Sequence, residues 1–251
     1  MRHYGIIGYP LLHSFSAKYF NEKFEREKID AEYSLYPIIV ESQKSKVESQ
    51  ELIELLNTLD GMNVTLPYKQ TVIPYLERLD ETAEAIGAVN VVYKRVGYNT
   101  DCLGFMASIQ PLLREYDQKA LVLGTGGASK AACYGLKKLG IAPTLVSRSP
   151  KEGMLSYEDL SDEVMESHTV VVNCTPLGML PEVDTCPAIP YEKITARHLL
   201  FDCVYNPEET LFLKRGKAQG ASIKNGFEML VGQAKAAWEI WNQSGEIKNL
   251  K

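Results

Sequence analysis

Polar side chains that can bind a small ligand recur in the first part of the chain, where apolar strand-like segments pass into turns. They supply hydroxyl, amide, ammonium and carboxylate groups, with no aromatic cage and no cluster of arginines. In open parallel sheets, ligands bind beyond the carboxyl ends of the strands. This chemistry suits a small polyhydroxylated or carboxylated substrate. The candidate residues are Ser14, Ser16, Asn63, Thr65, Lys69, Asn90 and Asp101.

Each of these candidates also has a purely structural explanation. Ser16 can cap a helix, Asn63 and Asn90 can occupy turns, and Lys69 can lie on a solvated helix face. Asp101 can cap the helix that follows it. Taken one at a time, the structural explanation is favoured for every residue. The recurrence at several successive strand ends favours a binding site.

A second kind of chemistry is indicated by a glycine cluster after the apolar run 120–123. The usual G-x-G-x-x-G/A pattern fits at Gly124 and Gly126, whereas Ser129 holds the third position. Such glycines let the backbone turn tightly towards a pyrophosphate, and free N–H groups at the helix start bind its charge. We therefore expect a dinucleotide to be bound here, although a plain strand-to-helix turn is the alternative. The expected cofactor-binding residues are Gly124, Thr125, Gly126, Gly127 and Ala128.

The loop after the next strand indicates which dinucleotide is bound. An Asp or Glu about 20 residues beyond the glycines usually binds a free ribose 2′-hydroxyl. This chain instead has Ser147, Arg148 and Ser149 there, with Lys151 close by. A guanidinium and hydroxyls bind a 2′-phosphate, which an acid would repel. We predict NADP rather than NAD, the alternative being an exposed basic loop.

The hydrophobic pattern predicts the helices and strands that position these residues. Predicted strands alternate with predicted helices through most of the chain. In the first half we expect a largely parallel, covered sheet. Its expected strands are 4–9, 31–40, 63–65 and 87–93; its expected helices are 46–58, 81–86 and one beginning near Pro67, with a polar loop at 97–101. A helix over 103–115 should then lead to the glycine turn. In the second half we expect strands at 120–123, 142–146, 170–173, 199–202 and 221–224, and helices at 128–139, 208–219 and 226–241.

This order of elements predicts an α/β protein with two α/β domains. The first, a substrate-binding and catalytic domain, comprises residues 1–101 and 226–251. The second, over 102–225, is a Rossmann domain that binds NADP. The C-terminal helix is expected to return to the first domain, because nothing in the second domain requires it.

Composition excludes several classes of protein. A hydrophobic content of 45% with 24% charged residues is typical of a soluble globular protein, and the net charge of -5 argues against a nucleic-acid partner. The chain has no apolar stretch approaching the ~20 residues that span a bilayer. Its five cysteines form no C-x-x-C pair, and its four histidines show no metal-binding spacing. We expect a cytoplasmic monomer or homodimer with reduced cysteines, no metal and no membrane partner.

The chain resembles the shikimate dehydrogenase family over nearly its whole length. Asn-Val-Thr-x-Pro-x-Lys together with Asn-Thr-Asp is its most specific part. Among the smaller departures from the family's pattern, Ala17 and Val91 replace a frequent proline and threonine. The matching segments begin at Gly8, Asn63, Gly87, Asn99, Gly124, Asn173, Asp202 and Gly232, in the family's order.

The resemblance implies reversible, NADP-linked reduction of 3-dehydroshikimate to shikimate, a step of chorismate and aromatic amino acid biosynthesis. It implies Lys69 and Asp101 as the catalytic pair, with Lys69 transferring a proton to the oxygen that the cofactor's hydride reduces. The implied substrate-binding set adds Tyr205 and Gln233 to Ser14, Ser16, Asn63, Thr65 and Asn90. Thr175, Cys203 and Gly226 would lie near the nicotinamide.

Two other functions remain open at this point. The first is a quinate/shikimate dehydrogenase with relaxed substrate or cofactor choice. The second, from a different class, is a non-catalytic sensor that binds NADP. The presence of Lys69, Asp101 and the polar strand ends weakens the sensor interpretation.

Overall fold

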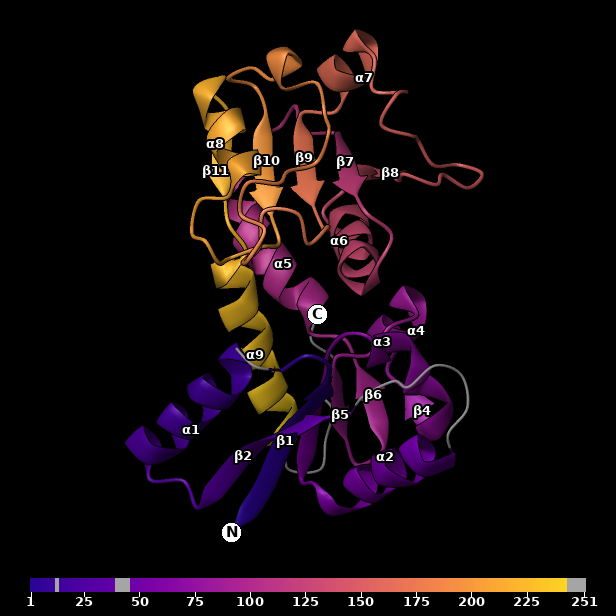
Figure 1. The fold of residues 1–251 in the computed structure, drawn as a ribbon, viewed down its shortest axis with the longest axis vertical. Helices are drawn as coiled ribbons and strands as arrows, with labels where there is room; N and C mark the ends of the chain where they lie inside the picture. The colour runs from indigo at the N-terminus through magenta and orange to yellow at the C-terminus, as the bar shows by residue number, and fades with distance from the viewer. Residues whose placement is uncertain (12–13, 39–45, 243–251) are drawn as a thin grey trace. The chain divides into compact units, whose positions relative to one another are not determined.

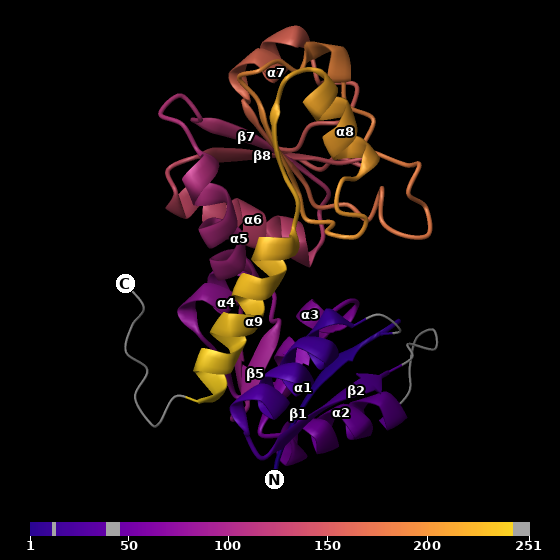
Figure 2. The ribbon, with the colours of Figure 1, turned by 90° about the vertical axis from the view of Figure 1, so that its left-hand side faces the viewer.

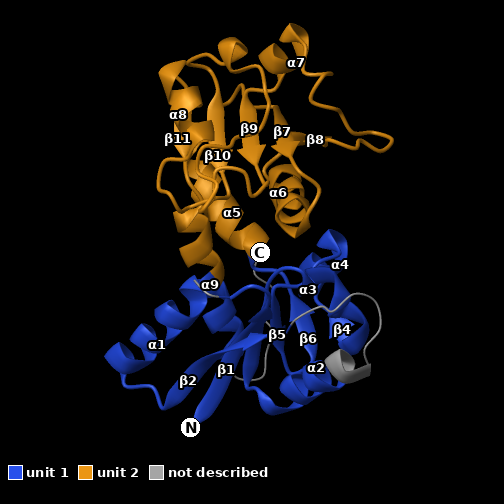
Figure 3. Cartoon of the chain, in the orientation of Figure 1, with its two compact units in different colours: residues 1–100, 234–251 blue, residues 101–233 orange. Residues whose placement is uncertain are grey.

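A computed structural model describes residues 1–11, 14–38 and 46–242, and the side chains of all of these except 46–49 (Figure 1). The chain divides into two compact units (Figure 3). Unit 1 comprises residues 1–100 and 234–251, and unit 2 comprises residues 101–233. Each unit contains one sheet, with six strands in unit 1 and five in unit 2 among the described residues.

The sheet of unit 1 has the order β2-β1-β3-β5-β6-β4. Its strands are β1 (Arg2–Gly8), β2 (Ala31–Pro37), β3 (Gly61–Val64), β4 (Arg78–Leu79), β5 (Val91–Tyr93) and β6 (Val96–Tyr98). β1 pairs in parallel with β2 and β3, as expected. β5 is antiparallel to both β3 and β6, whereas β4 pairs with β6 in parallel. Five of the six described strands therefore run in one direction, and the largely parallel sheet is confirmed with β5 as the one difference.

A two-residue hairpin turn causes this difference. Lys94 and Arg95 connect β5 to β6 with φ of 47° and 59°. Both angles are positive, as the turn that matches strand twist requires, and Asn-Gly is its usual sequence signal. Because Lys-Arg carries no such signal, the sequence predicted a polar loop over 97–101, where the end of β6 and the first residue of α5 lie.

Two hydrophobic cores cover the two faces of this sheet. The helices of unit 1 are α1 (Phe15–Glu27), α2 (Lys46–Thr58), α3 (Tyr68–Thr71), α4 (Glu81–Ile86) and the 3-10 turn η1 (Ile73–Tyr75). Tyr4 and Ile6 of β1 pack with Phe20 of α1 on one face, whereas Ile7 packs with Leu55 of α2 on the other. Alternation along a strand places successive side chains on opposite faces.

Unit 2 contains the predicted parallel sheet, in the order β11-β10-β9-β7-β8. Its strands are β7 (Lys119–Leu123), β8 (Ala142–Val146), β9 (Val170–Asn173), β10 (Leu199–Asp202) and β11 (Ser222–Lys224). β8 and β9, the next two strands in sequence, flank β7 on opposite sides. The strand order therefore reverses beside β7, and such a switch point is where doubly wound sheets bind ligands.

Helices pack against both faces of this second sheet. They are α5 (Asp101–Ile109), η2 (Gln110–Leu112), α6 (Gly127–Lys138), α7 (Asp162–Ser167), η3 (Tyr191–Lys193) and α8 (Leu211–Ala218). α5 lies beside α6 (Figure 2). Val122 packs with Phe105 and Leu136 on one face, and Leu123 packs with Phe212 on the other. α7 was not predicted from the sequence.

The last helix, α9 (Phe227–Trp241), belongs to both units. A Cβ at Gly104 of α5 would collide with the carbonyl oxygen of Met229, so the first part of α9 lies against the α5 backbone. The contact boundary accordingly falls after Gln233, whereas the sequence predicted a domain boundary at residue 226. The part of α9 in unit 1 ends at Trp241, whose indole N–H donates to the Val92 carbonyl at 3.2 Å.

Among the described residues, none of the helices has the length and apolar character needed to cross a membrane.

Candidate active site

The first predicted site residues lie at the start of α1. Ser14 occupies the N-cap position with φ of -66° and ψ of 113°, but its side chain makes no capping hydrogen bond. Ser16 lies inside the first turn of the helix and is buried, so the expectation that it caps the helix is wrong.

Asn63 and Asn90 are joined by a chain of buried hydrogen bonds that also includes Tyr33 and Thr100. The Tyr33 hydroxyl donates to Asn63 Oδ1 at 2.7 Å. Asn63 Nδ2 donates to the Asn90 carbonyl at 3.2 Å. Asn90 Oδ1 accepts the Thr100 N–H at 2.7 Å, and Asn90 Nδ2 donates to Thr100 Oγ1 at 3.0 Å. We call Tyr33, Asn63, Asn90 and Thr100 the unit 1 network.

Thr65 and Lys69 lie just beyond β3. The Thr65 N–H donates to the Ile7 carbonyl at 2.9 Å, and its carbonyl accepts the Tyr68 N–H at 2.9 Å. A Cβ at Gly8 would collide with the Thr65 methyl group, so a glycine is needed at that position. Lys69 is in the first turn of α3, where it was predicted, and its carbonyl accepts the Val89 N–H at 2.7 Å.

Three further candidates belong to unit 2. Asp101 is the first residue of α5 and is buried, directly after Thr100 of the unit 1 network. Gln233 is also buried, and its Nε2 donates to the Leu230 carbonyl at 2.9 Å. Tyr205 lies beyond β10 and is partly buried, which raises the pKa of its phenol.

The glycine turn has the geometry that a bound pyrophosphate requires. Gly124 has φ of 106°, a conformation that favours glycine, and its N–H donates to the Val146 carbonyl at 2.9 Å. Gly126 is the N-cap of α6, and a Cβ there would meet no atom of the described residues within 4 Å. Ser129 replaces the third glycine without strain, because its buried hydroxyl donates to the Gly126 carbonyl at 2.7 Å.

A second buried network, the unit 2 network, lies at the ends of β9 and β10. Asp202 Oδ1 accepts Asn173 Nδ2 and the Val204 N–H, both at 2.9 Å, while Oδ2 accepts the Thr210 hydroxyl at 2.5 Å. Asn173 Oδ1 accepts the Thr175 hydroxyl at 2.7 Å, which fixes that candidate. Burial raises the pKa of Asp202 to about 6, although all three hydrogen bonds oppose the rise.

Cys203 and Gly226 lie beside the unit 2 network. Cys203 Sγ is 3.6 Å from Cys174 Sγ, and the Cys203 N–H donates to the Asn173 carbonyl at 2.9 Å. The bond between the thiols, together with burial, raises the pKa of Cys174 well above its usual value. A Cβ at Gly226 would collide with the Cys203 carbonyl, so only glycine fits there. The predicted nicotinamide residues are therefore neighbours in the structure.

The predicted 2′-phosphate loop follows β8. The Ser149 N–H donates to Ser147 Oγ at 3.1 Å, and the Ser147 N–H donates to the Leu155 carbonyl at 2.9 Å. Arg148 between the two serines is exposed. The hydrogen bonds of the two serines thus fix the conformation of the loop. Arg148 is exposed to solvent, where an anionic group can reach its guanidinium.

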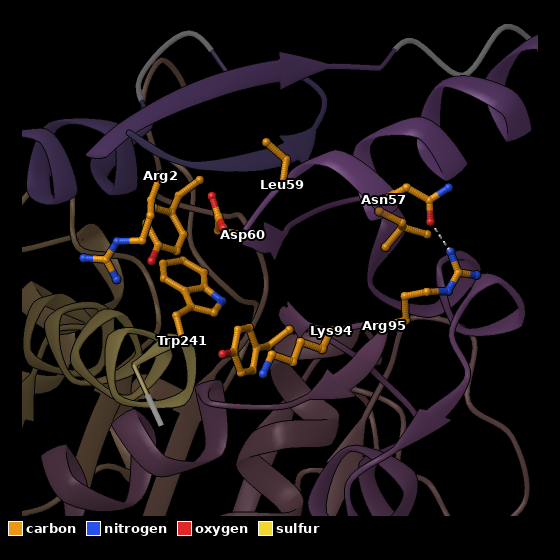
Figure 4. A pocket seen from close by; sticks show the side chains of 10 residues that line it. Arg2, Asn57, Leu59, Asp60, Lys94, Arg95 and Trp241 are labelled. Carbon is orange, nitrogen blue, oxygen red and sulfur yellow. Dashed lines mark hydrogen bonds between the residues drawn. The ribbon is translucent and has the colours of Figure 1, made fainter. Parts of the chain in front are cut away.

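Unit 1 also contains a cavity of about 500 Å³, which Figure 4 shows from close by. It is lined by Arg2, the first residue of β1, and by Trp241, Asn57 and Arg95 among others. The candidates lie at the opposite, carboxyl end of the sheet. The Arg95 guanidinium donates a hydrogen bond to Asn57 Oδ1 at 2.9 Å, so it is already bound to another residue of unit 1. None of the predicted site residues lines this cavity.

Within the described ranges, no three His, Cys, Asp or Glu side chains form a group that could hold a metal ion.

Tyr33, Thr100, Asn173 and Asp202 were not among the site residues predicted from the sequence, although they hold the predicted residues in place. For Asn173 and Asp202 a signal existed, because each is a polar residue that ends an otherwise apolar strand. Tyr33 gave no such signal, since an aromatic residue in an alternating strand is typical of a core position.

A parallel sheet with a glycine turn at its switch point and a basic loop after the second strand defines a dinucleotide-dependent oxidoreductase. A family profile described as shikimate dehydrogenase substrate binding domain matches residues 6–92. The chain belongs to the shikimate dehydrogenase family. It is 37% identical over 257 residues to the shikimate dehydrogenase (NADP(+)) of Clostridium beijerinckii, covering 97% of this chain and 93% of that one.

Solved structures give the same result. The crystal structure of shikimate dehydrogenase from Aquifex aeolicus has a TM-score of 0.83 and 34% identity, covering 96% of this chain and 92% of that one. The Thermus thermophilus shikimate 5-dehydrogenase in complex with NADP(H) and shikimate also has a TM-score of 0.83, at 27% identity, covering 96% and 94%. The predicted family and fold class are therefore confirmed.

Proposed function

We propose that this chain catalyses the reversible, NADP-dependent reduction of 3-dehydroshikimate to shikimate. One observation carries the proposal. The family's most specific motif residues, Asn63, Thr65, Lys69 and Asp101, are all present in a chain 37% identical to a relative named for this activity. A sensor without catalytic activity has no need for the lysine and the aspartate together.

The residues of unit 2 fit the cofactor. Gly124, Gly126 and the N-terminus of α6 would hold the pyrophosphate, since the space above Gly126 is open and the first N–H groups of a helix bind anions. Arg148 would hold the 2′-phosphate, with Ser147 and Ser149. Thr175, Cys203 and Gly226 would border the nicotinamide, which supplies the hydride.

The remaining candidate residues would bind and protonate the substrate. Lys69 donates a proton to the carbonyl oxygen as it becomes a hydroxyl group, and takes that proton back in the oxidation. Asp101 acts with Lys69 as its partner. Ser14, Ser16, Asn63, Thr65 and Asn90, with Tyr205 and Gln233, bind the carboxylate and hydroxyl groups of the substrate.

The test is an absorbance assay of NADPH formation with shikimate as the substrate. We expect the wild type to turn over, and Lys69→Ala to lower kcat by about 10²- to 10⁴-fold with little change in KM. Lys18→Ala, at an exposed lysine of α1, is the matched control and should behave as the wild type.

Three outcomes would contradict parts of the proposal. Binding of NADP without turnover of shikimate would leave the sensor interpretation. An effect of Lys69→Ala on KM alone would make Lys69 a binding residue only. A kcat/KM for quinate close to that for shikimate would favour the enzyme with relaxed substrate choice. A cytoplasmic location and a monomeric or homodimeric state stay predictions from the sequence.

A further inference from the structure

We propose that Tyr33 is a positioning residue of the substrate site, which fixes Asn63 through its hydroxyl group. β2, the strand that carries it, holds no residue of the candidate site. The inference rests on the proposed function, because it assigns to Tyr33 the control of residues proposed to bind the substrate.

The ring of Tyr33 is held firmly in the core of unit 1. It stacks on Phe20 of α1, with ring centroids 4.9 Å apart and planes 16° from parallel, and it contacts Trp241 of α9 at 6.3 Å. Only 2% of the residue is exposed. A ring packed in this way gives its hydroxyl group a fixed position.

The strand register brings that hydroxyl group to the site. Tyr33 is paired with Tyr4 of β1, and Asn63 of β3 is paired with Ile6 on the other side of the same strand. The phenol therefore reaches across β1 to meet Asn63 Oδ1 at 2.7 Å. A shorter side chain at position 33 would not span this strand.

The direction of each hydrogen bond follows from the groups involved. The Asn90 carbonyl can only accept, so the Asn63 group 3.2 Å from it is the Nδ2 donor, and Oδ1 faces Tyr33. Tyr33 gives its single proton to that oxygen.

These directions place Tyr33 at the start of a chain of hydrogen bonds through the site. Tyr33 fixes Asn63 on β3, and Asn63 continues to Asn90 and Thr100. Without the hydroxyl group, Asn63 keeps its bond to the Asn90 carbonyl, but its Oδ1 loses the Tyr33 donor. The Asn63 amide is then less firmly oriented, and the substrate must order it on binding.

The experiment uses the full chain with Tyr33→Phe, which keeps the stacked ring and removes only the hydroxyl group. We expect KM for shikimate to rise about tenfold, as the loss of one buried hydrogen bond implies. We expect kcat to change by less than about threefold, and KM for NADP⁺ not to change. Tyr191→Phe is the matched control, because this buried tyrosine of unit 2 donates to the Pro187 carbonyl at 2.9 Å.

Combination with Asn63→Ala separates positioning from a general loss of stability. If Tyr33 acts through Asn63, KM for shikimate in the double variant equals that of Asn63→Ala alone. Independent, multiplying effects would overturn the inference. Thermal unfolding of each variant gives the stability, and Tyr33→Met, which fills the core without a hydroxyl group, replaces the phenylalanine variant if that one does not fold.

The remaining outcomes distinguish the inference from the proposed function. A rise in KM for Asn63→Ala with none for Tyr33→Phe overturns the inference alone. Equal effects of Tyr33→Phe on KM for shikimate and for NADP⁺ do the same. If the wild type does not turn over shikimate, the proposed function fails, and the inference fails with it.

Discussion

The two units fix their candidate residues with buried networks of different chemistry. The unit 1 network consists of hydroxyl and amide groups, from Tyr33, Asn63, Asn90 and Thr100, none of which is charged. The unit 2 network is centred on a carboxyl group, Asp202, whose pKa burial raises to about 6. It lies at the carboxyl ends of the neighbouring strands β9 and β10.

This difference predicts how the stability of each unit depends on pH. Burying a neutral hydrogen-bonded group gives the same stabilisation at any moderate pH, whereas a buried carboxyl group is easier to accommodate when it is protonated. The cofactor unit therefore carries a pH-sensitive element near neutrality that the network of unit 1 lacks.

The largest expected effect is on the pH dependence of stability. The folded protein binds the Asp202 proton more tightly than the unfolded chain, whose pKa is near the ordinary 3.8. The stability from this group is complete below about pH 4 and is lost as pH rises through about 6, a difference of ~3 kcal/mol. Asp202→Asn should remove that loss, as seen by urea unfolding at a series of pH values.

A matched variant decides whether the comparison holds. Asn63→Ser in the unit 1 network should unfold with the same pH dependence as the wild type, because it changes no ionisable group. An unchanged pH profile in Asp202→Asn would show that the carboxyl group does not set the difference between the units.

The next effect tests the separation of cofactor and substrate binding. Arg148→Ala should lower kcat/KM for NADP⁺ by about thirtyfold, because a charge-assisted bond to the 2′-phosphate is worth about 2 kcal/mol. KM for shikimate should stay within about twofold of the wild type, the reverse of the result expected for Tyr33→Phe. Steady-state rates with NADP⁺ and NAD⁺ measure this, and equal losses with both cofactors would remove the proposed role.

The smallest effect compares helix caps in the two units. Asp80 caps α4 by accepting the Ala83 N–H at 2.8 Å, and Ser161 caps α7 by accepting the Val164 N–H at 3.3 Å. Asp80→Ala should lower the free energy of unfolding by about 1 kcal/mol, and Ser161→Ala by about half of that, since its bond is longer. Urea unfolding measures both values. A larger loss of unfolding free energy in Ser161→Ala than in Asp80→Ala would contradict this order.

Features set by local sequence were predictable. α2 and α4 have the predicted bounds, Lys46–Thr58 and Glu81–Ile86, because amphipathic spacing, an aspartate cap and a terminal glycine act within one helix. The turn from β7 to α6 was found for the same reason. Its glycines and the helix that follows lie within one short stretch of the chain.

Features set by strand register were not predictable. Tyr33 and Asn63 meet only because β2 and β3 lie on either side of β1, which no periodicity reveals. The β5–β6 turn, with Lys94 and Arg95 in the left-handed region, overrides the residue preference for that conformation. The division of α9 depends on how closely Gly104 lets that helix approach α5.

The division of α9 also sets the order in which the protein can be completed during synthesis. Unit 2 is continuous in sequence, so every residue of its core has left the ribosome once Gln233 has emerged. Unit 1 begins the chain but needs Ala237, Ile240 and Trp241 to close its core around Tyr4 and Phe20. The core of unit 1, although that unit begins the chain, can therefore be completed only after the end of α9 has been synthesised. Unit 2 can fold before that point.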